Sequence, residues 1–305
     1  MAKNRRIFLA ADPIVKVGPI RISQSIDIID DVTIEFIRDH HEDMAASTVP
    51  RWKTAIAKAI AEHEKAVGEC PPRPSPSNPK RSLMTPTSQV IQLASIDPSS
   101  PIPHVRSHIF REFVTPTSSP GLPLLLTTTD IRTPKTTQII SNPHVQIAWW
   151  IEGTQEQFRV SGVASAIPAP TNMLYKHFVH NVKHAKQTSA VAALTREGFD
   201  WEAKRMAMFR GMSGHMKASW CRPVPGSRLE GGEEEAKKWP VRLEEPGEHS
   251  TDEDRKNWEK ALGNFALVIV DPTDVDYVEL GVVPNRRTRF WKNGDGVWDE
   301  EALVP

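Results

Sequence analysis

Alternating apolar and polar residues mark two separated parts of the chain, residues 87–170 and 263–305. A period of two is typical of strands that bury one face. Short strands joined by tight turns, without alternating helices, indicate an antiparallel barrel rather than a doubly wound parallel sheet. The predicted strands are QVIQLASI, PIPHVRSHIFREFV, GLPLLLTTTD, HVQIAWWI, QFRVSGVASAI, NFALVIVDPTDVDYVELGVV, RRTRFWK and VWDEEALVP.

Two neighbouring strands, HVQIAWWI and QFRVSGVASAI, allow burial to be predicted residue by residue. Gln157, Arg159 and Ser161 occupy the face opposite to the apolar one. Adjacent strand residues point to opposite faces, so Trp149 and Trp150 cannot both face one ligand, and packing is the favoured role for both. The residues predicted to point inward are Val145, Ile147, Trp149, Ile151, Phe158, Val160 and Ala164.

Helical spacing appears outside the predicted strands. Residues 49–66, VPRWKTAIAKAIAEHEKA, predict an amphipathic helix, and residues 171–212 favour further helices. One turn of helix is expected in TTQIIS, residues 136–141. The apolar face of the first helix comprises Trp52, Ile56, Ala59, Ile60 and His63.

These patterns divide the chain into three parts. Residues 1–48 are an N-terminal extension that is poorly ordered or accessory. Residues 49–86 contain the first helix and a proline-rich connection, which cannot form regular structure because each proline removes a hydrogen-bond donor. Residues 87–305 form the main domain, a mainly β (α+β) antiparallel split barrel with flanking helices and a helical, acidic insertion at about 171–262.

Composition narrows the class of protein. The 305 residues include 38 Lys and Arg and 38 Asp and Glu, so no excess of cations attracts nucleic acid. The two cysteines form no zinc or disulfide pattern. The longest apolar runs have the length of strands and are too short to cross a membrane. We therefore expect a cytoplasmic protein, with mitochondrial import as a weaker alternative because acidic residues follow the basic start.

Familiar catalytic motifs are missing from the sequence. It contains no GxGxxG, GxxxxGK[ST], HExxH or GxSxG. His177, His180 and His184 share a helix face, but lysines and not carboxylates surround them. A solvated cationic face is the favoured interpretation, and no metal site is predicted.

Cationic and hydroxyl residues recur near the ends of several predicted strands. Individually each cation is a solvent-facing charge, but together with the threonines of TTTDIRTPKTT they could bind a phosphate dianion. The cations and the amide of this group are Arg106, Arg111, Arg132, Lys135, Gln157 and Arg159.

Four blocks resemble the FMN-binding split barrels of the pyridoxamine 5′-phosphate oxidase family. They are VRSHIFREFV, LPLLLTTTDIRTPKTTQIISNPHVQIAWWI, EQFRVSGVASAI and the closing VDYVEL…RRTRFW…GVWDEEALVP. The pattern is most similar to the Alr4036-type branch, which WCRPVPGS also resembles. The resemblance covers residues 87–170 and 263–305 and implies a homodimer with FMN at the subunit interface.

The resemblance also assigns roles to individual residues. The strand from Arg106 to Arg111 would lie along the cofactor, and Thr127 and Thr128 would bond it from a strand end. Thr133 and Lys135 would hold the phosphate, with Arg132 replacing an arginine that the family has and this chain lacks. The implied cofactor-binding residues are Arg106, Ser107, His108, Ile109, Arg111, Thr127, Thr128, Arg132, Thr133, Lys135, Gln157, Ser213 (from the partner subunit) and Arg287 or Arg286.

The chain departs from the family in its substrate-binding pattern. No R-x-H precedes Arg287, where VVPNRR stands, and Val278 occupies the position of an expected tryptophan. The resemblance therefore supports flavin binding more strongly than it supports oxidation of pyridoxamine phosphate. The leading interpretation is an FMN-dependent oxidoreductase acting on an unidentified small molecule. The alternatives are a non-catalytic flavin-binding or regulatory dimer and a barrel without ligand.

Overall fold

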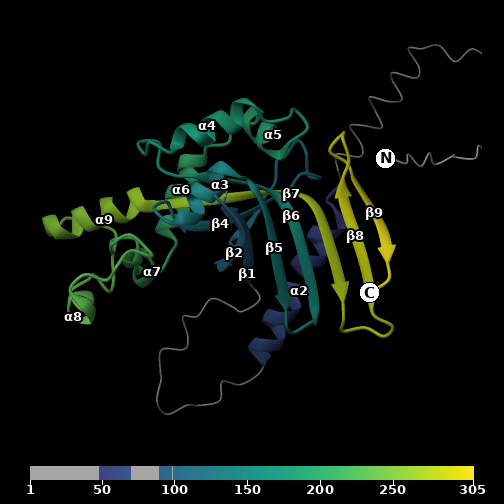
Figure 1. Ribbon diagram of the computed structural model, residues 1–305, viewed down its shortest axis with the longest axis horizontal. Helices are drawn as coiled ribbons and strands as arrows, with labels where there is room; N and C mark the ends of the chain where they lie inside the picture. Colours follow the sequence, from purple (N-terminus) through teal and green to yellow (C-terminus); the bar gives the residue numbers. More distant parts are fainter. Residues whose placement is uncertain (1–47, 70–88, 98) are drawn as a thin grey trace, which may run out of the picture. The chain divides into compact units, whose positions relative to one another are not determined.

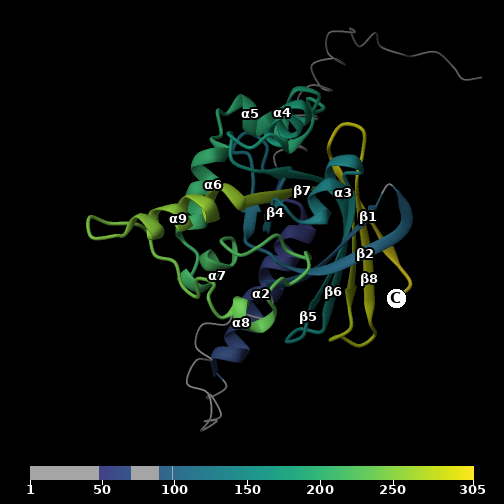
Figure 2. The ribbon, with the colours of Figure 1, turned by 60° about the vertical axis from the view of Figure 1, so that its left-hand side comes forward.

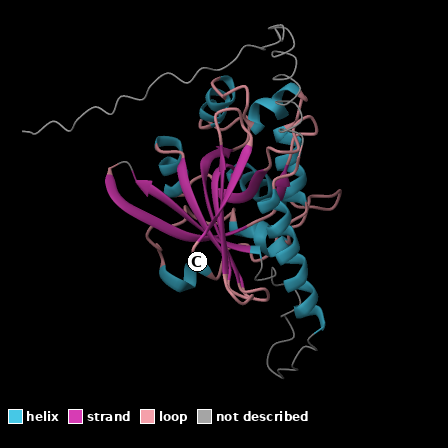
Figure 3. Ribbon diagram, turned by 90° about the vertical axis from the view of Figure 1, so that its right-hand side faces the viewer, coloured by secondary structure: helices cyan, strands magenta, loops and turns pink. Residues whose placement is uncertain are grey.

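The computed structural model describes residues 48–69, 89–97 and 99–305. All of them belong to one unit, His41–Pro305. The predicted N-terminal extension up to residue 47 and the proline-rich connection at 70–86 lie outside the described residues. Figure 3 shows strands crossing at the centre of this unit with helices around them.

One antiparallel sheet organises the described residues. Its order is β2-β1-β5-β6-β7-β4-β3, and β8 joins β7 to β9 (Figure 1). The strands are β1 (Val90–Asp97), β2 (Ser100–Ile109), β3 (Glu112–Val114), β4 (Leu124–Asp130), β5 (His144–Ile151), β6 (Glu156–Ile167), β7 (Phe265–Glu279), β8 (Arg286–Lys292) and β9 (Trp298–Leu303).

The segment PIPHVRSHIFREFV is two strands, so the prediction of one strand there is wrong. The chain changes partner between β2 and β3. The amide of Phe110 donates to the carbonyl of Gln89 beside β1, whereas the next amide, that of Arg111, donates to the carbonyl of Leu126 in β4, both over 2.8 Å. This change of partner places the residues of β2 next to the end of β4.

Strand β7 is long because it serves two sets of neighbours. Its first half pairs with β4 and its second half with β8, while β6 runs beside both halves. The pairing shifts by one residue at Gly162, opposite Pro272. A Cβ on Gly162 would lie 2.5 Å from the carbonyl oxygen of Asp271, so the close approach of the two strands requires glycine here.

Most of the helices lie on one side of the sheet (Figures 1 and 2). In Figures 1 and 2, α6 and α9 lie beside β4 and the start of β7, whereas β8 and β9 extend the opposite side of the sheet. None of the described helices is long and apolar enough to cross a bilayer. The helices are α2 (Arg51–Glu69), α3 (Pro134–Ser141), α4 (Tyr175–Lys183), α5 (Ala190–Arg196), α6 (Trp201–Arg210), α7 (Gly214–Ser219), α8 (Gly232–Ala236) and α9 (Asp252–Asn264).

Two apolar clusters lie on opposite faces of β4 and β7. One fills the barrel and includes Trp52, Trp149 and Phe158, and the other packs under the helices and includes Phe209 and Trp258. Burial on both faces explains why LPLLL and FALVIV are continuous apolar runs. The predicted inward residues of β5 and β6 are all buried, and Trp150 points to the other face with 40% of its surface exposed.

Candidate functional site

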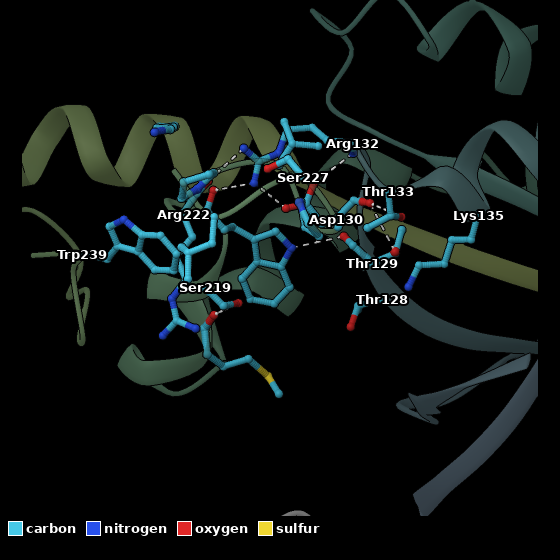
Figure 4. A pocket seen from close by; sticks show the side chains of 18 of the residues that line it. Thr128, Thr129, Asp130, Arg132, Thr133, Lys135, Ser219, Arg222, Ser227 and Trp239 are labelled. Carbon is cyan, nitrogen blue, oxygen red and sulfur yellow. Dashed lines mark hydrogen bonds and ion pairs between the residues drawn. The ribbon is translucent and has the colours of Figure 1, made fainter. Parts of the chain in front are cut away.

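A hollow of about 1170 Å³ lies between the ends of β2 and β4, the start of α3 and the segment from α7 to α8. Figure 4 shows Thr128, Thr133 and Lys135 at one end, Trp239 and Arg222 at the other, and Asp130 and Arg132 between them. The structure brings eight of the predicted residues to this hollow: Ser107, His108, Ile109, Arg111, Thr128, Arg132, Thr133 and Lys135.

The start of α3 places Lys135 in the hollow. Thr133 ends the loop after β4, and its hydroxyl donates to the carbonyl of Asp130 over 2.8 Å instead of accepting from the helix. Pro134 fixes the backbone for the first turn, which contains no acidic residue. A lysine in the first turn opposes the helix dipole, so this helix end favours an anion in front of it.

A line of hydrogen bonds runs behind Lys135. Its ammonium lies 3.3 Å from Nε2 of His108, whose Nδ1 lies 3.2 Å from the hydroxyl of Thr127. That hydroxyl donates to the carbonyl of Ile109 over 2.7 Å. His108 and Thr127 are both buried, so this line connects the hollow to the backbone of β2.

Burial and neighbouring cations control the protonation of this cluster. Desolvation, and then the charges of Lys135 and Arg106, lower the pKa of His108 to about 3, so its imidazole is neutral. Desolvation and the charge of Arg106 lower the pKa of Lys135 to about 8, although the carboxylate of Asp130 acts in the opposite direction.

Two arginines next to the hollow bind only neutral groups. Arg106 donates to Ser95 over 2.7 Å and to Gln138 over 3.0 Å. Arg111 contacts Thr128 and Met216, and its buried Nε has no acceptor among the described residues. A guanidinium that binds only neutral partners is suited to receive an anion or a strong acceptor. This applies most to Arg111, because its buried Nε–H lacks an acceptor among the described residues.

Arg132 is arranged differently from these two. Its guanidinium donates to both carboxylate oxygens of Asp130, over 2.9 and 2.6 Å, and to the carbonyl of Arg222 over 3.0 Å. These bonds join the end of β4 to the segment after α7. The side chain therefore forms part of the wall of the hollow, with its charge already paired.

Arg106 and Thr127 lie next to the hollow, whereas Gln157, Ser213 and the two arginines at 286 and 287 lie away from it. Gln157 lines a second, shallow hollow on the face of β5 and β6 that carries Trp150. Ser213 caps α7 by accepting from the amide of Met216. Arg287 forms a two-pronged ion pair with Asp276, and Arg286 pairs with Glu279.

Several lining residues were missing from the predicted set. Trp220 and Arg222 come from WCRPVPGS, and that block was the signal that could have pointed to them. The indole N–H of Trp220 donates to the carbonyl of Thr129 over 3.2 Å, which fixes this block beside β4. Asp130 was missed because its partner Arg132 was expected to bind the phosphate instead.

The histidines of α4 lie outside this hollow. The rings of His180 and His184 are 4.1 Å apart, and Nδ1 of His184 lies 2.8 Å from the carbonyl oxygen of His180. Within residues 48–69, 89–97 and 99–305, no group of three His, Cys, Asp or Glu side chains is arranged to hold a metal ion.

Comparisons with known proteins place this geometry in context. Residues 76–168 match the family model described as "Pyridoxamine 5'-phosphate oxidase, FMN-binding domain". No curated protein matches the chain. A solved pyridoxamine 5'-phosphate oxidase-related, FMN binding protein from Nostoc punctiforme PCC 73102 is 23% identical, with a TM-score of 0.56, over 85% of this chain and 100% of that one.

A second solved structure is more distant. PhzG from Burkholderia lata 383, in complex with tetrahydrophenazine-1-carboxylic acid, is 12% identical with a TM-score of 0.42, over 72% of this chain and 83% of that one. The Nostoc structure shows likeness of fold. The predicted antiparallel split barrel with flanking helices is confirmed.

Proposed function

Since residues 76–168 are identified as a pyridoxamine 5′-phosphate oxidase FMN-binding domain, we propose that the protein is a flavoprotein that transfers electrons between FMN and a small molecule. The match confirms the predicted family and cofactor, whereas the Alr4036-type branch and the oxidoreductase activity remain predictions. The large hollow is the proposed cofactor site.

One observation carries this proposal: three cations gather at one end of the hollow without a carboxylate partner among the described residues. Lys135 and Arg111 line the hollow, and Arg106 lies behind them next to His108 and Gln138. Elsewhere in the described barrel, Arg159 and Arg287 both pair with Asp276. Partly buried, unpaired cations are costly unless an anion joins them.

The residues at this end fit a phosphate monoester. Lys135 and Arg111 supply charge, and Thr128 supplies a hydroxyl donor, whereas the hydroxyl proton of Thr133 is donated to the carbonyl of Asp130. The hollow is also large enough for a ligand of nucleotide size, because such sites typically span about 300–1,000 Å³. When bound, FMN supplies the redox chemistry, and the protein positions it and excludes water.

We further propose that a second copy of the chain completes the site. The outer face of β1, β2 and β5 supports this, because it carries several apolar side chains beside Gln92 and Gln146. The apolar ones are Ala94, Ile96, Val105, Ala148 and Trp150. Val105 is 63% exposed, Ile96 42% and Trp150 40%. Gln157 pairs with Trp150 and points to the same face, and its hollow shares no residue with the large one. Gln157 would thus serve the cofactor of the partner copy.

Flavin binding is tested first by the absorption spectrum of the purified protein and then by titration with FMN and riboflavin. Lys135→Ala should weaken FMN by about 10- to 100-fold, because one charge-assisted bond to phosphate is lost. Riboflavin, which has no phosphate, should be little affected. Lys186→Ala, which removes an exposed lysine outside the large hollow, is the matched control.

Cofactor binding and electron transfer can be contradicted by separate results. A colourless protein that binds neither flavin would contradict the cofactor assignment. A protein that binds FMN but whose flavin is reduced by no candidate electron donor and reoxidised by no acceptor would be a storage or regulatory dimer. Equal losses for FMN and riboflavin in Lys135→Ala would remove Lys135 from the phosphate site.

A further inference from the structure

Thr127 lies next to the proposed phosphate site without lining it. The side chain is 2% exposed, and its hydroxyl reaches the carbonyl of Ile109 and the ring of His108. Thr128, the next residue, lines the hollow itself. Because adjacent strand residues point to opposite faces, Thr127 and Thr128 of β4 cannot share one role.

The direction of each hydrogen bond in this line follows from the carbonyl of Ile109, at which the line ends. A backbone carbonyl only accepts, so the 2.7 Å bond to Ile109 uses the hydroxyl proton of Thr127. The hydroxyl oxygen is then free to accept from Nδ1–H of His108. A neutral imidazole that carries its proton on Nδ1 has a lone pair on Nε2, 3.3 Å from the ammonium of Lys135.

The charged groups around His108 agree with this direction. Arg106 from β2 and Lys135 from α3 are both cations, and His108 is itself 4% exposed. A second proton on the ring would face these charges in a poorly solvated place, so the ring stays neutral. In the opposite tautomer, Nε2–H would point at the ammonium, and two donors would meet.

Resting on the proposed function, we propose that Thr127 and His108 are positioning residues of the phosphate site. The hydroxyl of Thr127 sets the tautomer of His108, and the Nε2 lone pair of His108 then holds the protonated amine of Lys135 toward the hollow. Lys135 is thereby held in place without a carboxylate bonded to it, whose charge would repel the phosphate. Thr127 acts through two side chains and does not touch the cofactor.

The tautomer is measured in the flavin-free protein by long-range proton–nitrogen NMR with labelled histidine, using His108→Gln to assign the signal. We expect a neutral ring with the proton on Nδ1 throughout the neutral pH range. A ring protonated on Nε2, or one that becomes doubly protonated near neutral pH, would overturn the proposal. This result does not depend on whether the protein binds FMN.

The hydroxyl is tested by Thr127→Val, which keeps the shape of the side chain, and by Thr127→Ser, which keeps the hydroxyl. Thr127→Val should weaken FMN about tenfold, the effect of one hydrogen bond to a charged group, and leave riboflavin within about twofold. Thr127→Ser should restore FMN binding to within about threefold of the natural protein.

Two results of the binding test would contradict this positioning role of Thr127. In one, both substitutions weaken FMN equally, so that the methyl group and not the hydroxyl matters. In the other, FMN and riboflavin lose affinity together, as expected if Thr127 only supports the strand. If Thr127→Val does not fold, the tautomer in the natural protein and the Thr127→Ser variant still decide. Failure of the natural protein to bind FMN would instead contradict the proposed function.

Discussion

Two properties of Lys135 disfavour its positive charge in the free protein. This residue stands in the first turn of α3, where the helix dipole disfavours a cation, and burial lowers its pKa to about 8. A phosphate dianion in front of the helix reverses both effects, because it interacts favourably with the helix end and with the ammonium. The residue is therefore better suited to the liganded than to the free site.

This combination predicts how FMN binding depends on pH. Binding requires protonated Lys135, so affinity should fall as pH rises above about 8, where the free protein loses this proton. Affinity should also fall below a pH of about 6, where the phosphate dianion gains a proton and becomes a monoanion. Isothermal titration across this range should show proton uptake on binding above neutral pH.

Lys135→Arg is the control for this profile. A guanidinium keeps its charge throughout the range, so the fall in affinity at alkaline pH should disappear. The affinity for riboflavin should fall neither at acidic nor at alkaline pH, in the natural protein and in Lys135→Arg alike. An alkaline fall that persists in Lys135→Arg would mean that another group titrates.

At the scale of elements, α2 shows how a periodic pattern becomes part of the barrel. Trp52, Ile56 and Ala59 are fully or almost fully buried, as their helical spacing predicted. The ring of Trp52 packs edge-on against Phe113 of β3 and Trp298 of β9, with ring centres 6.0 and 5.2 Å apart. The helix thus joins strands from both parts of the β-domain.

We expect Trp52→Ala to lower the free energy of unfolding by about 3–5 kcal/mol, because it leaves a large cavity between these elements. Trp52→Phe should cost much less, since the buried indole N–H has no acceptor among the described residues. Lys58→Ala on the exposed face of α2 should change stability by no more than about 0.5 kcal/mol. Urea unfolding measures all three, and similar losses for Trp52→Ala and Lys58→Ala would contradict this role of α2.

At the scale of the whole molecule, the outer face of β1, β2 and β5 predicts association. Exposed apolar side chains on one face of a sheet commonly mark an interface. Val105→Asp should therefore yield a monomer at low micromolar concentration and weaken FMN, since each site would lose its partner's Gln157. Sedimentation velocity measures the mass, and flavin titration the affinity.

Val241→Asp is a matched control, because Val241 is 65% exposed and Val105 63%, and Val241 lies outside the outer face. It should leave both mass and FMN affinity unchanged. A natural protein that sediments as a monomer while binding FMN would contradict the dimer and leave the cofactor site intact.

Much of the fold could be predicted because it depends on local periodicity. Alternation at Val145, Ile147 and Trp149 determines which face of β5 is buried, and the spacing of Trp52 and Ile56 determines the buried face of α2. The change of strand partner at Phe110 could not be predicted, because it depends on two backbone carbonyls that are distant in the sequence, those of Gln89 and Leu126.

By itself, the sequence determined the antiparallel barrel and the residue types that gather around the proposed phosphate site. It also placed Thr133 and Lys135 in one loop and helix start, because neighbours in the chain stay neighbours in space. Only the tertiary structure decided which cations remain unpaired. Arg132 meets Asp130 while Arg111 meets no carboxylate among the described residues. Asp130 and Arg132 are neighbours in the chain, but whether a cation meets a carboxylate of another strand depends on distances of a few ångströms that no local pattern contains.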